Sequence, residues 1–252
     1  MPAGAPAYRE MHQFPTVRPS CMALIVRIDV DRPYGKTPFL RHVLSRVGSD
    51  IYCPKVEAWG YLRELEIILQ MLNDAQVRSY VFFRRCTLPT KTVCDLMDKG
   101  GHVFGLHLEN SRSFETFCAE KAFLEQYIGR PVFAVSKHGS GKHKYGLHHY
   151  APYEPDKYID WVRRSGMNVF LGNLEDPTLR PLEEKGLHVY PSAFWLEPSW
   201  RDTSRFTVDW LRERAKSSDV VLLFHPDNVL ADPSLTEDLK LLLRSVETRL
   251  LT

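Results

Sequence analysis

Apolar residues along this chain follow two alternating patterns: short continuous runs, and longer stretches with three- and four-residue spacing. Continuous runs are typical of buried strands, whereas the wider spacing is typical of amphipathic helices that pack on a sheet. The runs predict seven strands, at residues 23–30, 78–84, 102–108, 131–136, 168–171, 187–191 and 220–224. The spaced stretches predict helices between them, at residues 56–74, 90–99, 114–128, 155–165 and 206–216, and from Leu235 onward.

The alternation of strands and helices predicts an α/β fold with a mainly parallel sheet, of which a barrel with fewer than eight units is one form. Residues 1–20 lack such a pattern and are expected to form an N-terminal arm, which leaves residues 21–252 as a single domain. One segment interrupts the alternation, since residues 137–155 are polar and rich in histidine, glycine and tyrosine. A loop of that length inside a compact domain is usually functional or disordered.

The composition narrows the class of protein. A chain of 252 residues that is 44% hydrophobic and 25% charged is typical of a soluble globular protein. Its formal net charge of +2 gives no basic field for nucleic acid, so a nucleic-acid partner is not expected. Five cysteines without a Cys-x-x-Cys pair favour a reducing cytoplasm over a disulfide framework. The sequence shows neither a signal-peptide core nor an apolar run that could form a transmembrane segment.

Two carboxylates, Asp29 and Asp31, stand at the end of the first predicted strand. A buried carboxylate is costly unless it is paired, hydrogen-bonded or bound to a metal. Alternate strand residues point the same way, so both side chains can face one space at the carboxyl end of the sheet, where α/β folds bind their ligands. Taken alone, the pair is explained equally well by a strand-end turn with solvated acids.

Further polar residues follow the ends of other predicted strands: His107 and Glu109, then Lys137 and His138, and finally His225. In a parallel sheet all of these ends lie at one edge. Histidine nitrogens together with carboxylate oxygens suit zinc or another first-row divalent ion, and a catalytic site keeps one position open for water. The pattern therefore predicts a mononuclear hydrolytic metal site.

Each histidine also has a structural explanation, because a lone histidine at a strand end is more often hydrogen-bonded than metal-bound. His107 is favoured as a ligand because the preceding Gly-x leaves it uncrowded, and His225 because an apolar run ends abruptly on it. His138 is evenly balanced between the two explanations. His102 comes earlier in its strand and is expected to make a structural hydrogen bond.

Competing motifs are incomplete. Gly139-Ser-Gly-Lys142 looks like the tail of a phosphate-binding P-loop, but Ser136 stands where that pattern needs its first glycine. The sequence has no Gly-x-Ser-x-Gly elbow for a serine nucleophile and no Gly-x-Gly-x-x-Gly after a strand for a dinucleotide.

Four segments resemble motifs of the polysaccharide deacetylase family, carbohydrate esterase family 4 and its relatives. Ile28-Asp-Val-Asp31 resembles the first motif, and residues 78–83 resemble the Phe-Phe strand that follows. Gly101-His-Val-Phe-Gly-Leu-His107 is similar to the family's Gly-His-Glu-Ile-Gly-x-His segment and is the most specific match, while residues 221–226 resemble the late histidine motif. The resemblance spans about residues 23–228 and implies an irregular, often seven-stranded (β/α) barrel.

The chain departs from the family at two motifs. Ser111 stands where the family has its second metal histidine, and Ser136-Lys-His-Gly139 replaces the Arg-x-Pro-Tyr segment. With His138 in the vacant position, the resemblance implies a divalent metal, zinc first among the candidates, bound by Asp31, His107 and His138. Glu109 is the reserve ligand. In these departures the chain resembles a divergent intracellular branch of the family, which is associated with bacterial O-antigen and surface-polysaccharide assembly.

The resemblance implies hydrolysis of an N-acetyl group from an amino sugar in a polysaccharide or in its nucleotide- or lipid-linked precursor. Asp29 would take the proton of the attacking water, and His225 would protonate the leaving amine. Four residues are expected to contact the substrate: Glu109, Lys137, Lys142 and Tyr145. A solvated surface loop is the alternative for residues 137–153.

Two other functions stay open on the sequence. A sugar-binding or scaffold protein that has lost catalysis would keep the fold but lack a complete metal set, which the serine at position 111 allows. A metal-dependent hydrolase of a non-sugar amide would share the metal site and differ only in the substrate pocket.

Overall fold

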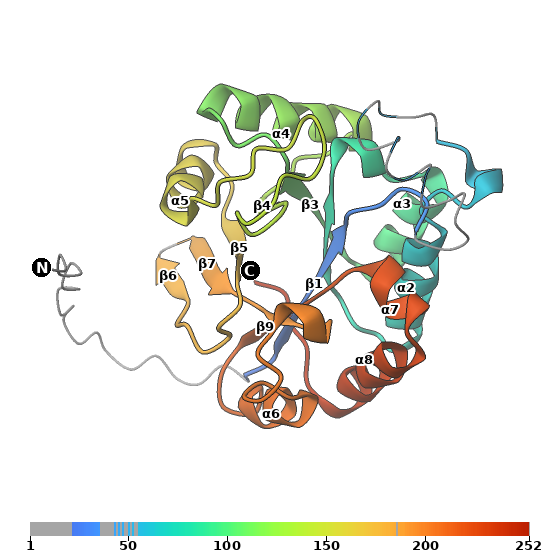
Figure 1. Ribbon diagram of the computed structural model, residues 1–252, viewed down its shortest axis with the longest axis vertical. Coiled ribbons are helices and arrows are strands. Elements are labelled where there is room, and N and C mark those ends of the chain that lie inside the picture. The colour runs from blue at the N-terminus through green and yellow to red at the C-terminus, as the bar shows by residue number, and fades with distance from the viewer. Residues whose placement is uncertain are drawn as a thin grey trace, which may run out of the picture.

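The computed structural model describes residues 22–35, 55–184 and 186–251, together with residues 43, 45, 47, 50 and 52. The arm expected for residues 1–20 lies outside these residues. Within them, nine strands form one sheet in the order β6-β7-β5-β4-β3-β2-β1-β9-β8, which curls into an irregular, open (β/α) barrel (Figure 1). The irregular barrel that the sequence predicts is confirmed.

All seven strands predicted from the apolar runs are present. Their observed bounds are β1 (Leu24–Val30), β2 (Tyr80–Phe83), β3 (Val103–Leu108), β4 (Ala134–Lys137), β5 (Val169–Leu174), β7 (Leu187–Ser192) and β9 (Val220–Phe224). Neighbouring members of this set pair in parallel. The sequence missed β6 (Leu182–Glu184), an exposed antiparallel edge strand, and β8 (Phe194–Trp195), which is parallel to β9. Both are too short to give a periodic signal.

The helices surround the sheet on its outer side (Figure 1). They are α2 (Arg63–Asp74), α3 (Lys91–Gly100), α4 (Phe114–Ile128), α5 (Pro155–Arg164), α6 (Val208–Arg214), α7 (Pro226–Ala231) and α8 (Pro233–Ser245), with short 3-10 turns η1 (Glu57–Trp59), η2 (Arg85–Thr87) and η3 (Pro198–Trp200). The single helix expected at residues 56–74 divides into η1 and α2, because Gly60 between them adopts the left-handed conformation with φ of 82°. The last predicted helix begins earlier than Leu235, as the pair α7 and α8.

Successive strand residues point alternately outward, under the helices, and inward, into the barrel. Inward-facing apolar side chains form a separate inner core: Ile25, Tyr80, Phe82, Ala134, Val169, Leu171, Tyr190, Ala193, Trp195, Val221, Leu223 and Leu251. Gly105 faces the same space, since a Cβ there would lie 2.4 Å from ring atoms of Phe82. The glycine therefore leaves room for an aromatic ring beneath the next inward residue of β3, which is His107.

The C-terminal segment closes one end of the barrel. Leu24, the first residue of β1, forms a bridge with Thr248, and the Tyr80 hydroxyl donates to the carbonyl of Leu251 at 3.0 Å. These contacts lie at the amino ends of the strands. The carboxyl ends, at the opposite side, are left to form a site.

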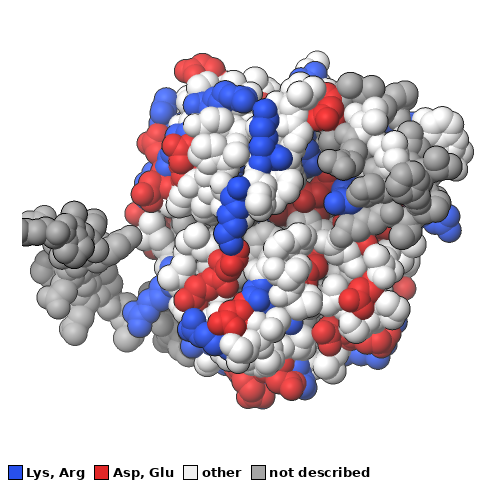
Figure 2. Space-filling model, in the orientation of Figure 1, with Lys and Arg blue, Asp and Glu red and all other residues white. Residues whose placement is uncertain are grey.

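Among the described residues on the face drawn in Figure 2, lysine and arginine side chains are interspersed with aspartate and glutamate, without a large region of one charge. No helix in the described part of the chain has both the length and the apolar character needed to cross a membrane.

Candidate active site

The carboxyl ends of β1, β3, β4 and β9 bring five polar side chains to one cavity of about 570 Å³. Asp29 lies in β1 and His107 in β3, while Asp31, His138 and His225 directly follow β1, β4 and β9. All five line the cavity. Strand alternation explains the selection, because each of these residues follows the inward-facing members of its strand at steps of two. The sequence expectation that these residues meet at one edge of the sheet is met.

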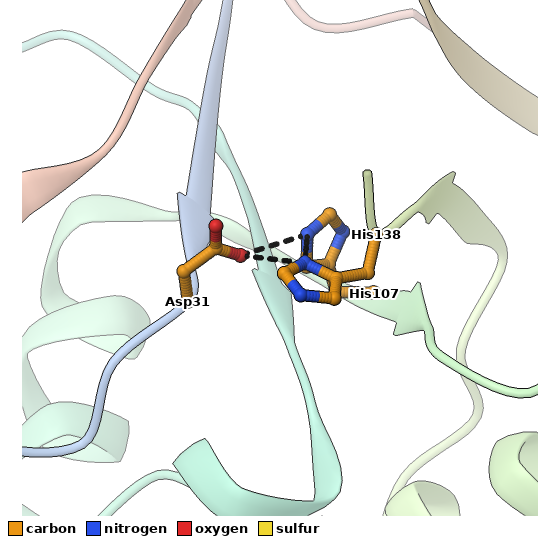
Figure 3. A group of neighbouring side chains, drawn as sticks. All are labelled: Asp31, His107 and His138. Atoms are coloured by element: carbon orange, nitrogen blue, oxygen red, sulfur yellow. Dashed lines mark hydrogen bonds and ion pairs between the residues drawn. The ribbon is translucent and has the colours of Figure 1, made fainter. Parts of the chain in front are cut away.

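Asp31, His107 and His138 converge on one point (Figure 3). The Oδ1 atom of Asp31 lies 3.0 Å from His107 Nε2 and 3.0 Å from His138 Nδ1. The two imidazole nitrogens are 3.2 Å apart. One carboxylate oxygen and two imidazole nitrogens in this arrangement fit a divalent cation with open positions, so the residues present suit the metal that the motifs imply.

The protonation states also suit a metal, which needs an ionised carboxylate and neutral imidazoles. Burial lowers the pKa of His138 well below its ordinary value, and the nearby Arg84 guanidinium adds to that effect. Burial by itself would raise the pKa of Asp31, but His138 and His225 beside it hold that pKa well below its usual range.

His107 and His138 differ in how their rings are held. His107 has a hydrogen bond of 2.7 Å between its Nδ1 and the hydroxyl of Ser136, which leaves Nε2 facing Asp31. The Nε2 atom of His138 is buried and has no hydrogen-bond partner among the described residues. His138 therefore lacks the usual second contact that orients a metal-binding histidine.

Asp29 is held by a fully buried arginine on its own strand. Arg27 Nε and Nη2 donate to the two carboxylate oxygens of Asp29 at 2.9 and 2.6 Å. The remaining nitrogen, Nη1, donates to the carbonyls of Leu171 and Gly172 at 2.9 and 2.7 Å. Asp29 Oδ2 also lies 3.6 Å from His107 Nε2, so this carboxylate borders the candidate metal position without being its closest oxygen.

His225 is paired with Glu197, which follows β8. Glu197 Oε1 accepts from the backbone N–H of His225 at 2.9 Å and lies 2.8 Å from its Nδ1. His225 Nε2 faces Asp31 Oδ2 at 3.4 Å. Burial alone would lower the pKa of His225, but Glu197 and Asp31 together raise it to about 10.

The four expected substrate contacts separate into two groups. Tyr145 lines the cavity, and Lys142 pairs with Glu175 of the cavity wall at 2.9 Å. Lys137 and Glu109 are not among the residues that line the cavity.

Lys137 and Glu109 have partners elsewhere. Strand β4 extends through Lys137, and alternation turns its side chain away from the inward-facing Ser136 and His138; it is fully buried. Glu109, the reserve candidate for the third metal ligand, forms a buried ion pair with Arg84, so its carboxylate is already engaged. Ser111, at the family's histidine position, is buried and lies 3.2 Å from the hydroxyl of Tyr158 on α5.

Sequence reasoning missed three residues that support the site: Arg27, Glu197 and Asn173. Arg27 carried a usable signal, because an arginine within an otherwise apolar run must find buried partners, and Asp29 stands two residues later on the same face. Glu197 and Asn173 lie far along the chain from the residues they contact, and no periodicity marks them.

Comparisons with known proteins agree with this fold. No protein-family model matches the sequence, and no curated protein matches it. A structure from Mycobacterium smegmatis assigned as a polysaccharide deacetylase is similar with a TM-score of 0.54 and 15% identity, over 90% of this chain and 84% of that one. A Streptococcus mutans CE4 esterase has a TM-score of 0.48 and 13% identity, over 89% of this chain and 81% of that one. The similarity to the Mycobacterium smegmatis structure shows that the chain has the fold of polysaccharide deacetylases, as its motifs predict.

Proposed function

We propose that this protein is a metal-dependent hydrolase that removes the N-acetyl group from an amino sugar of a polysaccharide or of its precursor. The observation that carries the proposal is the convergence of Asp31, His107 and His138 in a cavity that Asp29 and His225 also line. A divalent cation held by these three side chains, with zinc the first candidate, would polarise the acetamide carbonyl and lower the pKa of a bound water toward neutrality.

We assign the proton transfers of the reaction to two side chains that line the cavity. Asp29, oriented by its two hydrogen bonds from Arg27, accepts the proton that the attacking water loses. His225 donates a proton from Nε2 to the leaving amine nitrogen, while Glu197 holds its Nδ1. Glu197 beside it raises the pKa of His225, which favours the protonated form of this acid before reaction.

The cavity mouth supports a sugar as substrate. Tyr145 and Trp200 both line the cavity and are 43% and 38% exposed, so these two aromatic residues are our candidates for contact with a pyranose ring. Lys144 lines the same mouth and Lys142 lies beside it, which favours an anionic nucleotide- or lipid-linked precursor. A place in O-antigen assembly in the cytoplasm is proposed from the resemblance of the motifs.

A second candidate function rests on Ser111. Its hydroxyl bonds to Tyr158, so the family's histidine position contributes nothing to the site, and the third ligand beside Asp31 and His107 has to be His138. A protein that binds sugars without hydrolysing them would have this feature. A hydrolase of a non-sugar amide would keep the metal ligands and differ only in the residues that contact the substrate.

Metal content and acetate release test the proposal together. We expect about one equivalent of divalent metal per chain, and metal-dependent acetate release from oligomers of β-linked N-acetylglucosamine that stops with a chelator and returns with zinc. If the purified protein holds no stoichiometric metal and cannot be reconstituted with it, the proposed enzymatic activity is refuted. Metal with acetate release from N-acetyl-lysine peptides but from no acetamido sugar identifies the non-sugar amidohydrolase instead.

A further inference from the structure

Asn173, at the end of β5, joins the two halves of the candidate site. It is buried, and its Oδ1 accepts from Arg27 Nη2 at 2.7 Å. Its Nδ2 donates to the carbonyls of Lys137 and Gly139, at 2.5 and 3.0 Å. These carbonyls belong to the residues immediately before and after His138. The amide group of Asn173 therefore contacts both Arg27, which holds Asp29, and the backbone on either side of His138.

The carbonyl of His138 itself is contacted by two other side chains. Lys137 Nζ donates to it at 2.5 Å, and His149 Nε2 lies 2.7 Å from it. The backbone N–H of Tyr145 donates to His149 Nδ1 at 2.9 Å, which leaves the ring proton on Nε2 and makes that nitrogen a donor to the carbonyl. Three consecutive carbonyls, at residues 137–139, are thus fixed by side-chain donors.

Backbone control matters more for His138 than for His107. His138 faces Asp31 through Nδ1, the ring nitrogen nearest the main chain, so the position of this nitrogen follows the backbone closely. The distal Nε2 has no partner in the described part of the chain, whereas His107 has Ser136 on its second nitrogen. Metal-binding histidines normally depend on such a second contact for their orientation.

The local backbone favours this arrangement. β5 has a register shift between Leu171 and Leu174 against β7, the signature of a β-bulge, which re-aims carbonyls and side chains next to sites. Both carbonyls that contact Arg27 Nη1 come from this bulge. After His138 the chain turns through Gly139 at a φ of 77°, where a Cβ would lie 3.0 to 3.1 Å from atoms of Tyr145 and His149.

We propose that Asn173 is a positioning residue that sets the ligand geometry of His138 and, through Arg27, the orientation of Asp29. It keeps the metal ligand and the proton acceptor in a fixed relation across the barrel. The inference rests on the metal centre of the proposed function and adds a determinant of its affinity outside the ligands. Loss of such outer contacts typically lowers metal affinity by about 10- to 100-fold.

Two substitutions separate the roles of the amide. Asn173→Asp keeps an oxygen for Arg27 but loses the N–H donors and turns a negative oxygen toward the carbonyls of Lys137 and Gly139. Asn173→Ala removes both contacts. The matched control is Asn168→Ala, which removes the same type of side chain directly before the first residue of β5.

The experiment uses the full chain, stripped of metal and titrated with Zn²⁺ against a chromophoric chelator. Visible absorption of the Co²⁺-substituted protein reports ligand geometry, and circular dichroism with the melting temperature of the metal-free protein reports folding. We expect both Asn173 variants to bind Zn²⁺ about 10- to 100-fold more weakly, with an altered Co²⁺ spectrum, while Asn168→Ala matches the wild type. His149→Ala, which removes another donor to the His138 carbonyl, should shift affinity in the same direction.

The outcomes distinguish the inference from the function on which it rests. Wild-type affinity and spectrum in folded Asn173→Asp overturn the positioning role and leave the metal centre intact. If Asn173→Ala does not fold, the isosteric aspartate variant and His149→Ala decide the question. A wild-type chain that binds no Zn²⁺ overturns the metal centre itself, and the inference with it.

Discussion

Asp29 and His225 each face the cavity with an oppositely charged partner behind them. Arg27 gives Asp29 two hydrogen bonds, and Glu197 gives His225 two contacts, so neither proton-carrying group depends on solvent for its orientation. A buried charge without a partner would be strongly destabilising, which explains why both groups occur as pairs. The Oδ2 atom of Asp29 remains next to His107, and the Nε2 atom of His225 remains next to Asp31.

Asp29→Asn tests the division of labour between the two aspartates. The amide has nearly the same shape but cannot act as a base at neutral pH, so turnover should fall by about 10²- to 10⁴-fold. Metal content should stay close to that of the wild type, because Asp31, His107 and His138 are unchanged. Acetate release and metal analysis on one preparation give both values. Turnover within a few-fold of the wild type would exclude Asp29 as the base, and loss of metal would make it a ligand.

The strand, as an element, decides which of these residues can meet. Period-two alternation turns Arg27, Asp29 and Asp31 to the inside of the barrel together, and it does the same for Ser136 and His138. These placements could be predicted from the sequence once the strands were located. The sequence predicts the end of β4 one residue too early, at Ser136. The strand extends through Lys137, whose buried side chain therefore lies outside the cavity and not in the polar loop.

His102, directly before β3, contacts α2 and the residue directly before β2, at the amino ends of these strands. Its Nδ1 accepts from the backbone N–H of Ser79 at 3.1 Å, and its Nε2 lies 2.9 Å from Asn73 Oδ1 on α2. The structural hydrogen bond expected for this histidine is confirmed. Burial lowers the pKa of His102 from its ordinary value to about 4.

A lowered histidine pKa predicts how stability changes with pH. Between about pH 4 and 6.5 the unfolded chain binds the His102 proton more tightly than the folded chain, so the free energy of unfolding increases with pH across this window. The contribution, on the order of 3 kcal/mol, should be complete above pH 6.5 and lost as the pH falls. Urea unfolding of His102→Asn should show a flatter pH dependence than that of the exposed-site control His143→Asn. Equal slopes in the two variants would contradict this prediction.

At the scale of the whole molecule, the seven main strands follow from continuous apolar runs, which the sequence displays locally, whereas the order of the strands in the sheet does not. The contacts that complete the site are not local. Arg27 and Asn173 are separated by 146 residues, and His225 and Glu197 by 28, so no spacing rule joins either pair. Closure of the barrel brings β1 opposite β5, and only that closure defines which polar side chains become partners.

The same closure predicts that metal binding stabilises the fold. The three candidate ligands come from β1, β3 and β4, so a cation held by all of them binds the folded chain and not the unfolded one. At a free metal concentration about 100 times the dissociation constant, the stabilisation is about 2.7 kcal/mol, or a rise of about 5 to 10 °C in melting temperature for a chain of this size. Thermal unfolding with Zn²⁺ and with a chelator measures the difference. His107→Ala should lose both the metal and the shift, because Asp31 and His138 alone leave the centre with two protein ligands. A wild-type melting temperature that is the same in zinc and in chelator would argue against a resident metal.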